Sequence, residues 1–202
     1  ANRVKLKLTA SGKDLDALEN QLEEEISKVR PLLKAHIISE NGDKIEEILH
    51  DFLISRNLTI STAESCTGGE LSHLITSVSG SSNYFLGGIC TYKTEKKTEI
   101  LGVSEDLIKE KTVVSAEVAE AMSLGCQKLF KTDIALSTTG VAGPNSDEFN
   151  TEIGTVFYSI RVKDFEKTFR LYLPHLERKD FMNFVSQKVL QDLIQILIQE
   201  NL

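Results

Sequence analysis

One short segment of the chain combines a hydroxyl, a thiol and two glycines in a way that suits nucleophilic chemistry. It reads Thr-Ala-Glu-Ser-Cys-Thr-Gly-Gly over residues 62–69, between a predicted strand and a predicted helix. Such a junction exposes a side chain beside backbone N–H groups that lack a partner within the helix. Gly68 and Gly69 let a ligand approach the backbone closely, and the first amides of the helix suit an oxyanion or a phosphate. Ser65 is therefore the candidate nucleophile.

The same segment allows two alternatives to a Ser65 nucleophile. Serine and threonine are favoured helix caps, so a capping role for Ser65 or Thr67 also explains the pattern. Cys66 is a rival nucleophile, although a single cysteine beside a strand end is more often a small buried hydrophobic residue. The segment by itself leaves these roles open.

A serine nucleophile needs a base, and the histidines of this chain are not in suitable segments. They lie in stretches predicted as helix, strand end or hairpin exit, at His36, His50, His73 and His175. This placement argues against a Ser-His-Asp triad. Lysine replaces histidine as the base when burial or a nearby positive charge lowers its pKa enough for a neutral amine to exist near pH 7.

Three lysines follow a predicted strand over residues 84–92. The segment reads Tyr-Lys-Thr-Glu-Lys-Lys over residues 92–97 and supplies Lys93, Lys96 and Lys97. A charge run at a strand end is commonly a solvated surface segment. The residues alone thus leave both a base and a solvated run as interpretations of these lysines.

The overall composition limits the class of protein and of partner. With 202 residues, 41% of them hydrophobic and 26% charged, the chain has the balance of a globular protein with one main domain and an appendage. A net charge of −7 repels phosphate backbones, so nucleic acid is not an expected partner. No apolar run approaches the roughly 18–20 residues that cross a bilayer, and no signal peptide is evident. We therefore expect a cytoplasmic protein without membrane contact.

The cysteines do not indicate a metal site. Cys66, Cys90 and Cys126 are widely spaced, with no Cys-x-x-Cys pair and no histidine beside them at zinc-ligand spacing. We expect reduced thiols.

The first part of the chain predicts a small, incomplete module. Val4, Leu6 and Leu8 alternate with basic residues, as in a half-buried strand, and a helical pattern follows until Pro31. One strand and one helix are too little to bury their own apolar faces, so the remaining pieces are expected upstream or across a dimer. The turn-forming stretch 39–43 is the candidate linker to the main domain.

Strands and helices alternate through the main domain. Apolar spacing predicts helices over residues 45–53, 71–78, 115–129 and 181–197, and strands over 58–61, 84–92 and 134–137, followed by a hairpin of 155–162 with 165–173. This order predicts an α/β fold, a mixed sheet covered by helices in three α/β/α layers, with the partial α/β module at its N-terminus. Such sheets place ligands at the carboxyl ends of their strands, where both glycine-bearing segments, 62–69 and 140–144, fall.

Several separate motifs together resemble one family. They are Thr-Ala-Glu-Ser-Cys-Thr-Gly-Gly at 62–69, Gly-Ser-Ser at 80–82, Tyr92 with Lys97 five residues on, Leu-Gly-Val at 101–103, Val-Ser at 114–115, Gly-Val-Ala-Gly-Pro at 140–144 and Gly-Thr-Val at 154–156. In order and spacing they resemble the CinA family, specifically its C-terminal nicotinamide-nucleotide amidase domain, over roughly residues 44–202. The resemblance favours Ser65 as nucleophile over Ser65 as a simple cap.

The resemblance implies hydrolysis of the carboxamide of nicotinamide mononucleotide to nicotinic acid mononucleotide and ammonia, with no metal and no cofactor. It places the family's serine on Ser65, its lysine on Lys97 and its aromatic partner on Tyr92. Lys97, alone or with Tyr92, would take the Ser65 proton, and amides at the start of the following helix would hold the oxyanion. The alternative is a catalytically weak nucleotide-binding or regulatory module of a larger CinA protein.

The residues expected to bind the substrate lie in the two glycine-bearing segments and near the start of the last helix. They are Thr67, Gly68, Gly69, Gly140, Ala142, Gly143 and Arg178. The resemblance leaves open which of the two glycine segments takes the phosphate, with Arg178 as cationic support.

Residues 1–43 resemble the end of the KH-type linker of longer family members. They lack the Gly-x-x-Gly loop that grips nucleic acid, so RNA binding is not expected, whereas an exposed partial module favours a homodimer. The main domain departs from the family at two places. Thr94 replaces the usual Asn, and the acidic stretch 145–152 replaces a Gly-Gly turn and a later Lys-Pro, which is expected to weaken phosphate binding or alter substrate preference.

Overall fold

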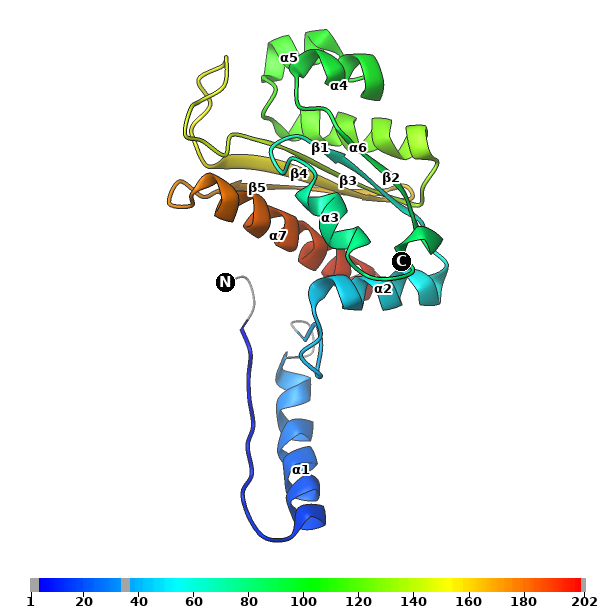
Figure 1. The fold of residues 1–202 in the computed structure, drawn as a ribbon, viewed down its shortest axis with the longest axis vertical. Coiled ribbons are helices and arrows are strands. Elements are labelled where there is room, and N and C mark those ends of the chain that lie inside the picture. Colours follow the sequence, from blue (N-terminus) through cyan, green and yellow to red (C-terminus); the bar gives the residue numbers. More distant parts are fainter. Residues whose placement is uncertain (1–3, 34–36, 201–202) are drawn as a thin grey trace.

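A five-stranded mixed sheet forms the centre of the protein. The computed structural model describes residues 4–33 and 37–200. The strand order is β2-β1-β3-β4-β5, with β2, β1 and β3 parallel and β4 and β5 antiparallel (Figure 1). The strands are β1 (Ile60–Glu64), β2 (Phe85–Cys90), β3 (Ile134–Gly140), β4 (Thr155–Val162) and β5 (Phe165–Tyr172).

Helices cover both faces of this sheet (Figure 1). On one face lie α2 (Ile45–Arg56), α3 (Glu70–Thr76) and α7 (Arg178–Gln199), and on the other lie α4 (Thr94–Leu101), α5 (Glu105–Lys111) and α6 (Ala116–Phe130). A short 3₁₀ turn, η1 (Ser81–Asn83), leads from α3 to β2. Two apolar clusters fill the two interlayer spaces. The predicted three-layer α/β/α arrangement of the main domain is confirmed.

Strand β1 is wholly buried although three of its five residues are polar. Its hydroxyls are satisfied by neighbouring elements: Ser61 Oγ lies 2.7 Å from Thr132 Oγ1, and Thr62 Oγ1 lies 2.7 Å from Ser72 Oγ. Because side chains alternate along a strand, Thr62 and Glu64 face the α3 layer whereas Ser61 faces the α6 layer. Buried polar groups of this kind are stable only when they are hydrogen-bonded.

The topology brings four chain segments to one edge of the sheet. Strands β1, β2 and β3 are parallel and linked through helices, so their carboxyl ends share an edge. The antiparallel β4 begins at the same edge, where Gly140 pairs with Val156. The chain returns there before α7, since the Leu173 N–H donates to the Gly154 carbonyl at 2.8 Å. The polar and charged residues that follow β1, β2 and β3, together with those just before α7, therefore lie close together at this edge of the sheet.

The predicted N-terminal strand is wrong for the described residues. Residues 4–10 run alongside α1 (Leu15–Leu33) without strand pairing, and Val4 and Leu6 are 99% and 61% exposed (Figure 1). An alternating pattern becomes a strand only with a partner for its backbone, and none of the described segments pairs here. Pro31 also lies inside α1 and does not end it. No residue of α1 is buried, and the division at residue 43 stays a prediction.

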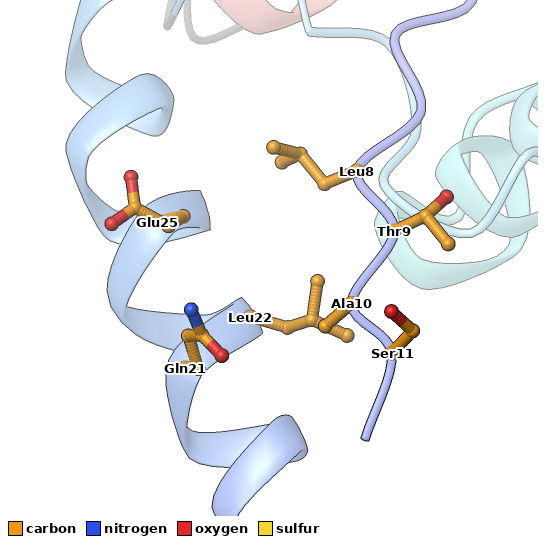
Figure 2. A pocket seen from close by; sticks show the side chains of 7 residues that line it. All are labelled: Leu8, Thr9, Ala10, Ser11, Gln21, Leu22 and Glu25. Carbon is orange, nitrogen blue, oxygen red and sulfur yellow. The ribbon is translucent and has the colours of Figure 1, made fainter.

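A pocket separates this N-terminal segment from α1. Figure 2 shows Leu8 and Leu22 pointing into the space between the two backbones, with Glu25 on the helix beside them. It lies away from the carboxyl edge of the sheet, where the sequence places the candidate site (Figure 1).

Other differences from the predicted elements are local. Strand β1 begins at Ile60 and continues to Glu64, while β2 ends at Cys90. The lysine-rich stretch after β2 leads into the helix α4, with Lys93 and Lys96 exposed as in a solvated run and Lys97 buried. Helix α5 was not predicted. Among the described residues, none of the helices is both long and apolar enough to cross a membrane.

Gly125 allows α6 to approach the end of α4. A Cβ atom at this position would lie 2.0 Å from the Leu101 carbonyl oxygen. We therefore expect Gly125→Ala to lower the free energy of unfolding by about 1–3 kcal/mol, as overpacking does. Urea denaturation measures the change. An ordinary Gly→Ala change inside a helix stabilises by roughly 0.5–1 kcal/mol, so a gain in stability would contradict the close contact.

Candidate functional site

A serine and a lysine from different segments meet at the carboxyl edge of the sheet. Ser65 directly follows β1, and Lys97 lies on α4, one segment beyond β2. The Lys97 Nζ donates to Ser65 Oγ at 3.1 Å and to the Thr91 carbonyl oxygen at 2.7 Å. Lys97 is 1% exposed and Ser65 is 9% exposed. The two residues that the sequence singles out as nucleophile and base are thus in direct contact and shielded from water.

The environment of Lys97 makes the neutral form of its amine accessible near neutral pH. Burial lowers its pKa from 10.5 to about 8, because the charged form loses hydration that the protein does not replace. Cys66, Cys90 and Glu95 act in the opposite direction but more weakly. With a pKa near 8, roughly one-tenth of the amine is neutral at pH 7. A lysine of this kind can accept a proton from a hydroxyl.

Cys66 is a poorer nucleophile than its position beside Ser65 suggests. The side chain is 4% exposed, and burial raises the pKa of its thiol to about 12. Since the thiolate is the reactive form of cysteine, this thiol is almost entirely unreactive near pH 7. Cys66, Cys90 and Cys126 are all free, and Cys90 is the exposed one.

A buried carboxylate organises the turn after Ser65. Glu64 is 1% exposed and accepts from the backbone N–H groups of Gly69, Leu71 and Ser72 at 2.9, 3.1 and 2.8 Å. It also accepts from the hydroxyls of Thr67 and Ser72. The amides at the start of α3 are therefore occupied by this side chain, which corrects the expectation that they hold an oxyanion or a phosphate. In the described part of the chain, the Thr67 N–H has no hydrogen-bond partner.

Thr67, Gly68 and Gly69 shape the same turn. The Thr67 side chain is fully buried, and its hydroxyl lies 2.8 Å from Thr138 Oγ1 besides donating to Glu64. Gly68 and Gly69 have φ angles of +62° and +101°, a region that favours glycine. The Thr67 side chain thus holds the turn in place, and the backbone N–H of Thr67 is the group that remains available to a ligand.

The segment after β3 offers backbone amides next to Arg178. A Cβ on Gly140 would lie 2.6 Å from the Thr155 carbonyl oxygen, so this glycine serves the packing of β3 against β4. The N–H groups of Ala142 and Gly143 have no partner within residues 4–33 and 37–200. Arg178 Nη1 donates to the Gly143 carbonyl at 2.8 Å. These amides and the guanidinium together form the candidate anion site.

Tyr92 joins this second group and not the Ser65–Lys97 pair. Its hydroxyl accepts from Arg178 Nη2, and among the described residues it makes no hydrogen bond to Ser65 or Lys97. The tyrosine is 57% exposed. The structure therefore divides the predicted residues into a buried Ser65–Lys97 pair and an outer group of Tyr92, Gly143 and Arg178.

The two departures from the family pattern contact each other. The Thr94 hydroxyl, at the start of α4, donates to Glu148 Oε1 at 3.2 Å. The loop carrying Glu148 is organised by Asp147, which accepts from the N–H groups of Phe149 and Thr151 at 3.1 and 2.8 Å. The Glu148 carboxylate thus contacts Thr94, two residues after Tyr92 in the chain.

Sequence reasoning did not assign roles to Glu64 and Thr91. Glu64 stands at the end of a strand just before a Gly-Gly turn, a signal that could have indicated a capping carboxylate. Thr91 carried no such signal, because its carbonyl contact with Lys97 depends on the fold. In the described ranges, no three His, Cys, Asp or Glu side chains cluster as a candidate metal site.

Comparison with known proteins identifies the family. Residues 42–197 match the family profile described as the CinA C-terminal domain. The chain belongs to the CinA family. A CinA-like protein of Flavobacterium psychrophilum is 47% identical over 159 residues, which cover 78% of this chain and 38% of that protein. For a CinA-like protein of Cytophaga hutchinsonii the identity is 32% over 180 residues, covering 89% and 43%. The chain thus spans about two-fifths of the length of these CinA relatives.

Solved structures of the CinA superfamily share the fold. The competence damage-inducible protein A of Klebsiella pneumoniae superposes with a TM-score of 0.74 at 26% identity, covering 78% of this chain and 99% of that one. A competence-damaged protein (CinA) superfamily protein of Escherichia coli gives a TM-score of 0.73 at 27% identity, covering 82% and 98%. Both cover nearly the whole of the other chain, so the three-layer domain is the shared unit of these CinA proteins.

The buried amine of Lys97 should cost this CinA domain stability at neutral pH. The fall in its pKa from 10.5 to about 8 corresponds to roughly 3 kcal/mol. We expect Lys97→Met, which replaces the amine with an apolar group of similar shape, to raise the free energy of unfolding at pH 7 by about 2–3 kcal/mol.

The pH dependence gives the sign of this effect. Between pH 8 and 10.5 the unfolded chain binds the Lys97 proton and the folded chain does not, so the unmutated protein gains stability as pH rises through this window. The difference from Lys97→Met should therefore shrink by pH 10.5. Urea unfolding of both proteins at pH 7 and pH 10.5 measures it, and a gap that stays constant with pH would exclude a buried charged amine as its cause.

Proposed function

We propose that this CinA domain is a nicotinamide-nucleotide amidase that converts nicotinamide mononucleotide to nicotinic acid mononucleotide and ammonia. The observation that carries the proposal is the buried contact between Lys97 Nζ and Ser65 Oγ at 3.1 Å. A buried lysine with a lowered pKa beside a serine hydroxyl is a recognised means of activating a nucleophile. The family membership and the carry-over of its serine and lysine onto these positions support the same reaction.

In the first half-reaction, the neutral Lys97 amine takes the Ser65 proton as Ser65 Oγ attacks the carboxamide carbon. The carbonyl electrons move to oxygen, and the resulting oxyanion needs hydrogen-bond donors. Because Glu64 occupies the amides at the start of α3, the free Thr67 N–H is the candidate donor. Collapse of the tetrahedral intermediate breaks the C–N bond, and Lys97 gives its proton to the departing ammonia.

In the second half-reaction, water replaces ammonia. Lys97, again neutral, takes a proton from a water molecule that attacks the acyl carbon, and the second intermediate releases the carboxylic acid as the proton returns to Ser65 Oγ. The substrate stays in place through its phosphate, which we assign to the free amides of Ala142 and Gly143 with Arg178 beside them. Tyr92, which contacts Arg178, would orient that guanidinium.

Ammonia release from nicotinamide mononucleotide by the purified chain tests the proposal. We expect turnover in the unmutated protein and a loss of about a thousandfold or more in kcat for Ser65→Ala and for Lys97→Met. Lys96→Met is the matched control for the base, because Lys96 is half exposed and pairs with Glu99 on the surface. Cys66→Ala is the control for the nucleophile.

The same assay separates the competing interpretations. Full activity in Ser65→Ala with loss in Cys66→Ala would make Cys66 the nucleophile. Saturable binding of the nucleotide without ammonia release by the folded, unmutated protein would favour a binding or regulatory module. Activity in both Ser65→Ala and Lys97→Met would remove the pair from the mechanism.

The assignment of the phosphate predicts a substrate-dependent effect of Arg178. We expect Arg178→Ala to raise KM for nicotinamide mononucleotide by about 10- to 100-fold and to leave the kinetics with the dephosphorylated nucleoside nearly unchanged, because a guanidinium–phosphate pair is a strong charge-assisted interaction. Steady-state kinetics with both substrates measure the difference, and Lys179→Ala is the control. An equal loss with both substrates would instead indicate that Arg178 only holds Gly143 and Tyr92 in place.

A further inference from the structure

The hydroxyl of Thr91 is buried without a hydrogen-bond partner. Thr91 is fully buried, and its Oγ1 atom is one of the few buried side-chain oxygens that have no partner within the described residues. Such a group destabilises a fold unless something satisfies it in another state. Valine has the same shape without the hydroxyl, so packing alone does not require threonine here.

The register of the sheet places Thr91 next to Ser65. Glu64 pairs with Cys90 in the parallel β1–β2 ladder, and the Thr91 N–H donates to the Glu64 carbonyl at 2.9 Å. Ser65 and Thr91 therefore follow directly on two neighbouring strands, and such strands lie about 4.8 Å apart. Ile89, two residues before Thr91, packs in the cluster on the α6 side. By alternation Thr91 faces that side too, where Lys97 of α4 reaches Ser65.

When Lys97 is protonated, one of its N–H donors lacks a hydrogen-bond acceptor. An ammonium group has three N–H donors, and in the described structure Lys97 Nζ has only two acceptors, the Thr91 carbonyl and Ser65 Oγ. In an acylated enzyme Ser65 Oγ is an ester oxygen and accepts poorly. An unused acceptor, the Thr91 hydroxyl, is on the same residue whose carbonyl oxygen already accepts from Nζ. The staggered positions about the Thr91 Cα–Cβ bond are alternative positions for this hydroxyl.

We propose that Thr91 is a positioning residue whose hydroxyl accepts a hydrogen bond from Lys97 Nζ when Lys97 is protonated, both in the resting protein and after Lys97 takes the proton of Ser65. The place of this contact in a catalytic cycle rests on the proposed amidase function, whereas the contact itself does not. The titratable groups that act on Lys97 are Cys66 on the turn after β1, Cys90 on β2 and Glu95 on α4, and none of them donates or accepts a hydrogen bond with Nζ in the described structure. These groups therefore leave the third N–H of the ammonium unsatisfied, and the buried Thr91 hydroxyl is an unused acceptor.

Direct titration of Lys97 tests this proposal without any substrate. NMR of the full chain with isotope-labelled lysine follows the Lys97 side-chain signal against pH, assigned by its absence in Lys97→Met. We expect Thr91→Val to lower the pKa of Lys97 by about one unit, because the charged form loses an acceptor. Thr91→Ser should retain the normal value. Thr168→Val is the matched control, since Thr168 Oγ1 is also buried and unpartnered but lies on β5.

Kinetics with nicotinamide mononucleotide supply the second readout. In Thr91→Val the rise of kcat/KM with pH should move to lower pH by the same amount, and kcat should fall about tenfold, with both restored in Thr91→Ser. An unchanged Lys97 pKa in Thr91→Val, or an equal fall in Thr168→Val, overturns the proposal; Thr91→Ala gives the same answer if the valine variant does not fold. A shifted pKa in a protein that releases no ammonia supports the Thr91 contact and rejects only the amidase function.

Discussion

The burial of one amine is the constraint on which the arrangement of this site depends. Lys97 is almost fully enclosed, and among the described residues its Nζ bonds one carbonyl and one hydroxyl oxygen and no carboxylate. Water would restore an ordinary lysine pKa, so the low value exists only while α4 stays packed over the sheet. The close approach of α6 to the end of α4 at Gly125 therefore affects the burial and the pKa of Lys97 as well as the packing of the helices.

A second constraint acts on the other face of the same strand. Glu64 and Ser65 are consecutive, so alternation sends their side chains to opposite faces of the sheet. Glu64 accepts hydrogen bonds from the amides at the start of α3 and so holds the turn in place, while Ser65 accepts a hydrogen bond from Lys97. The end of β1 thus supplies both the carboxylate that holds the turn and, in the next residue, the hydroxyl that contacts Lys97. Glu64 thus occupies the amides at the start of α3 that the sequence suggests for a ligand. Within the described residues, the amides without a hydrogen-bond partner include those of Thr67, Ala142 and Gly143.

Much of the fold was predictable because the local signals agreed with the final packing. The hairpin of β4 and β5, the helix capped by Ser115 and the last helix all appear near their predicted positions. The wrong predictions concern two properties that residue spacing does not contain. One is whether a strand has a neighbouring strand to pair with, and the other is whether a side chain is buried. Residues 4–8 alternate like a strand but have no strand beside them in the described structure, and the lysines of 93–97 resemble a solvated run although Lys97 is in the core.

The sequence by itself determined the family and the α/β order of the main domain, and it selected Ser65 and Lys97 as the candidate nucleophile and base, because motif spacing and apolar periodicity are properties of the chain. The local pattern of residues 92–97 left Lys97 as either a base or a surface charge, and only the family resemblance favoured the base. Only the tertiary structure decided that Lys97 lies in contact with Ser65, that Tyr92 lies instead with Arg178, and that Glu64 takes the amides beside the serine. These outcomes depend on burial and on contacts between strands and helices far apart in the chain. For Lys97, burial has the largest effect on the pKa, and the nearby Glu95 acts more weakly.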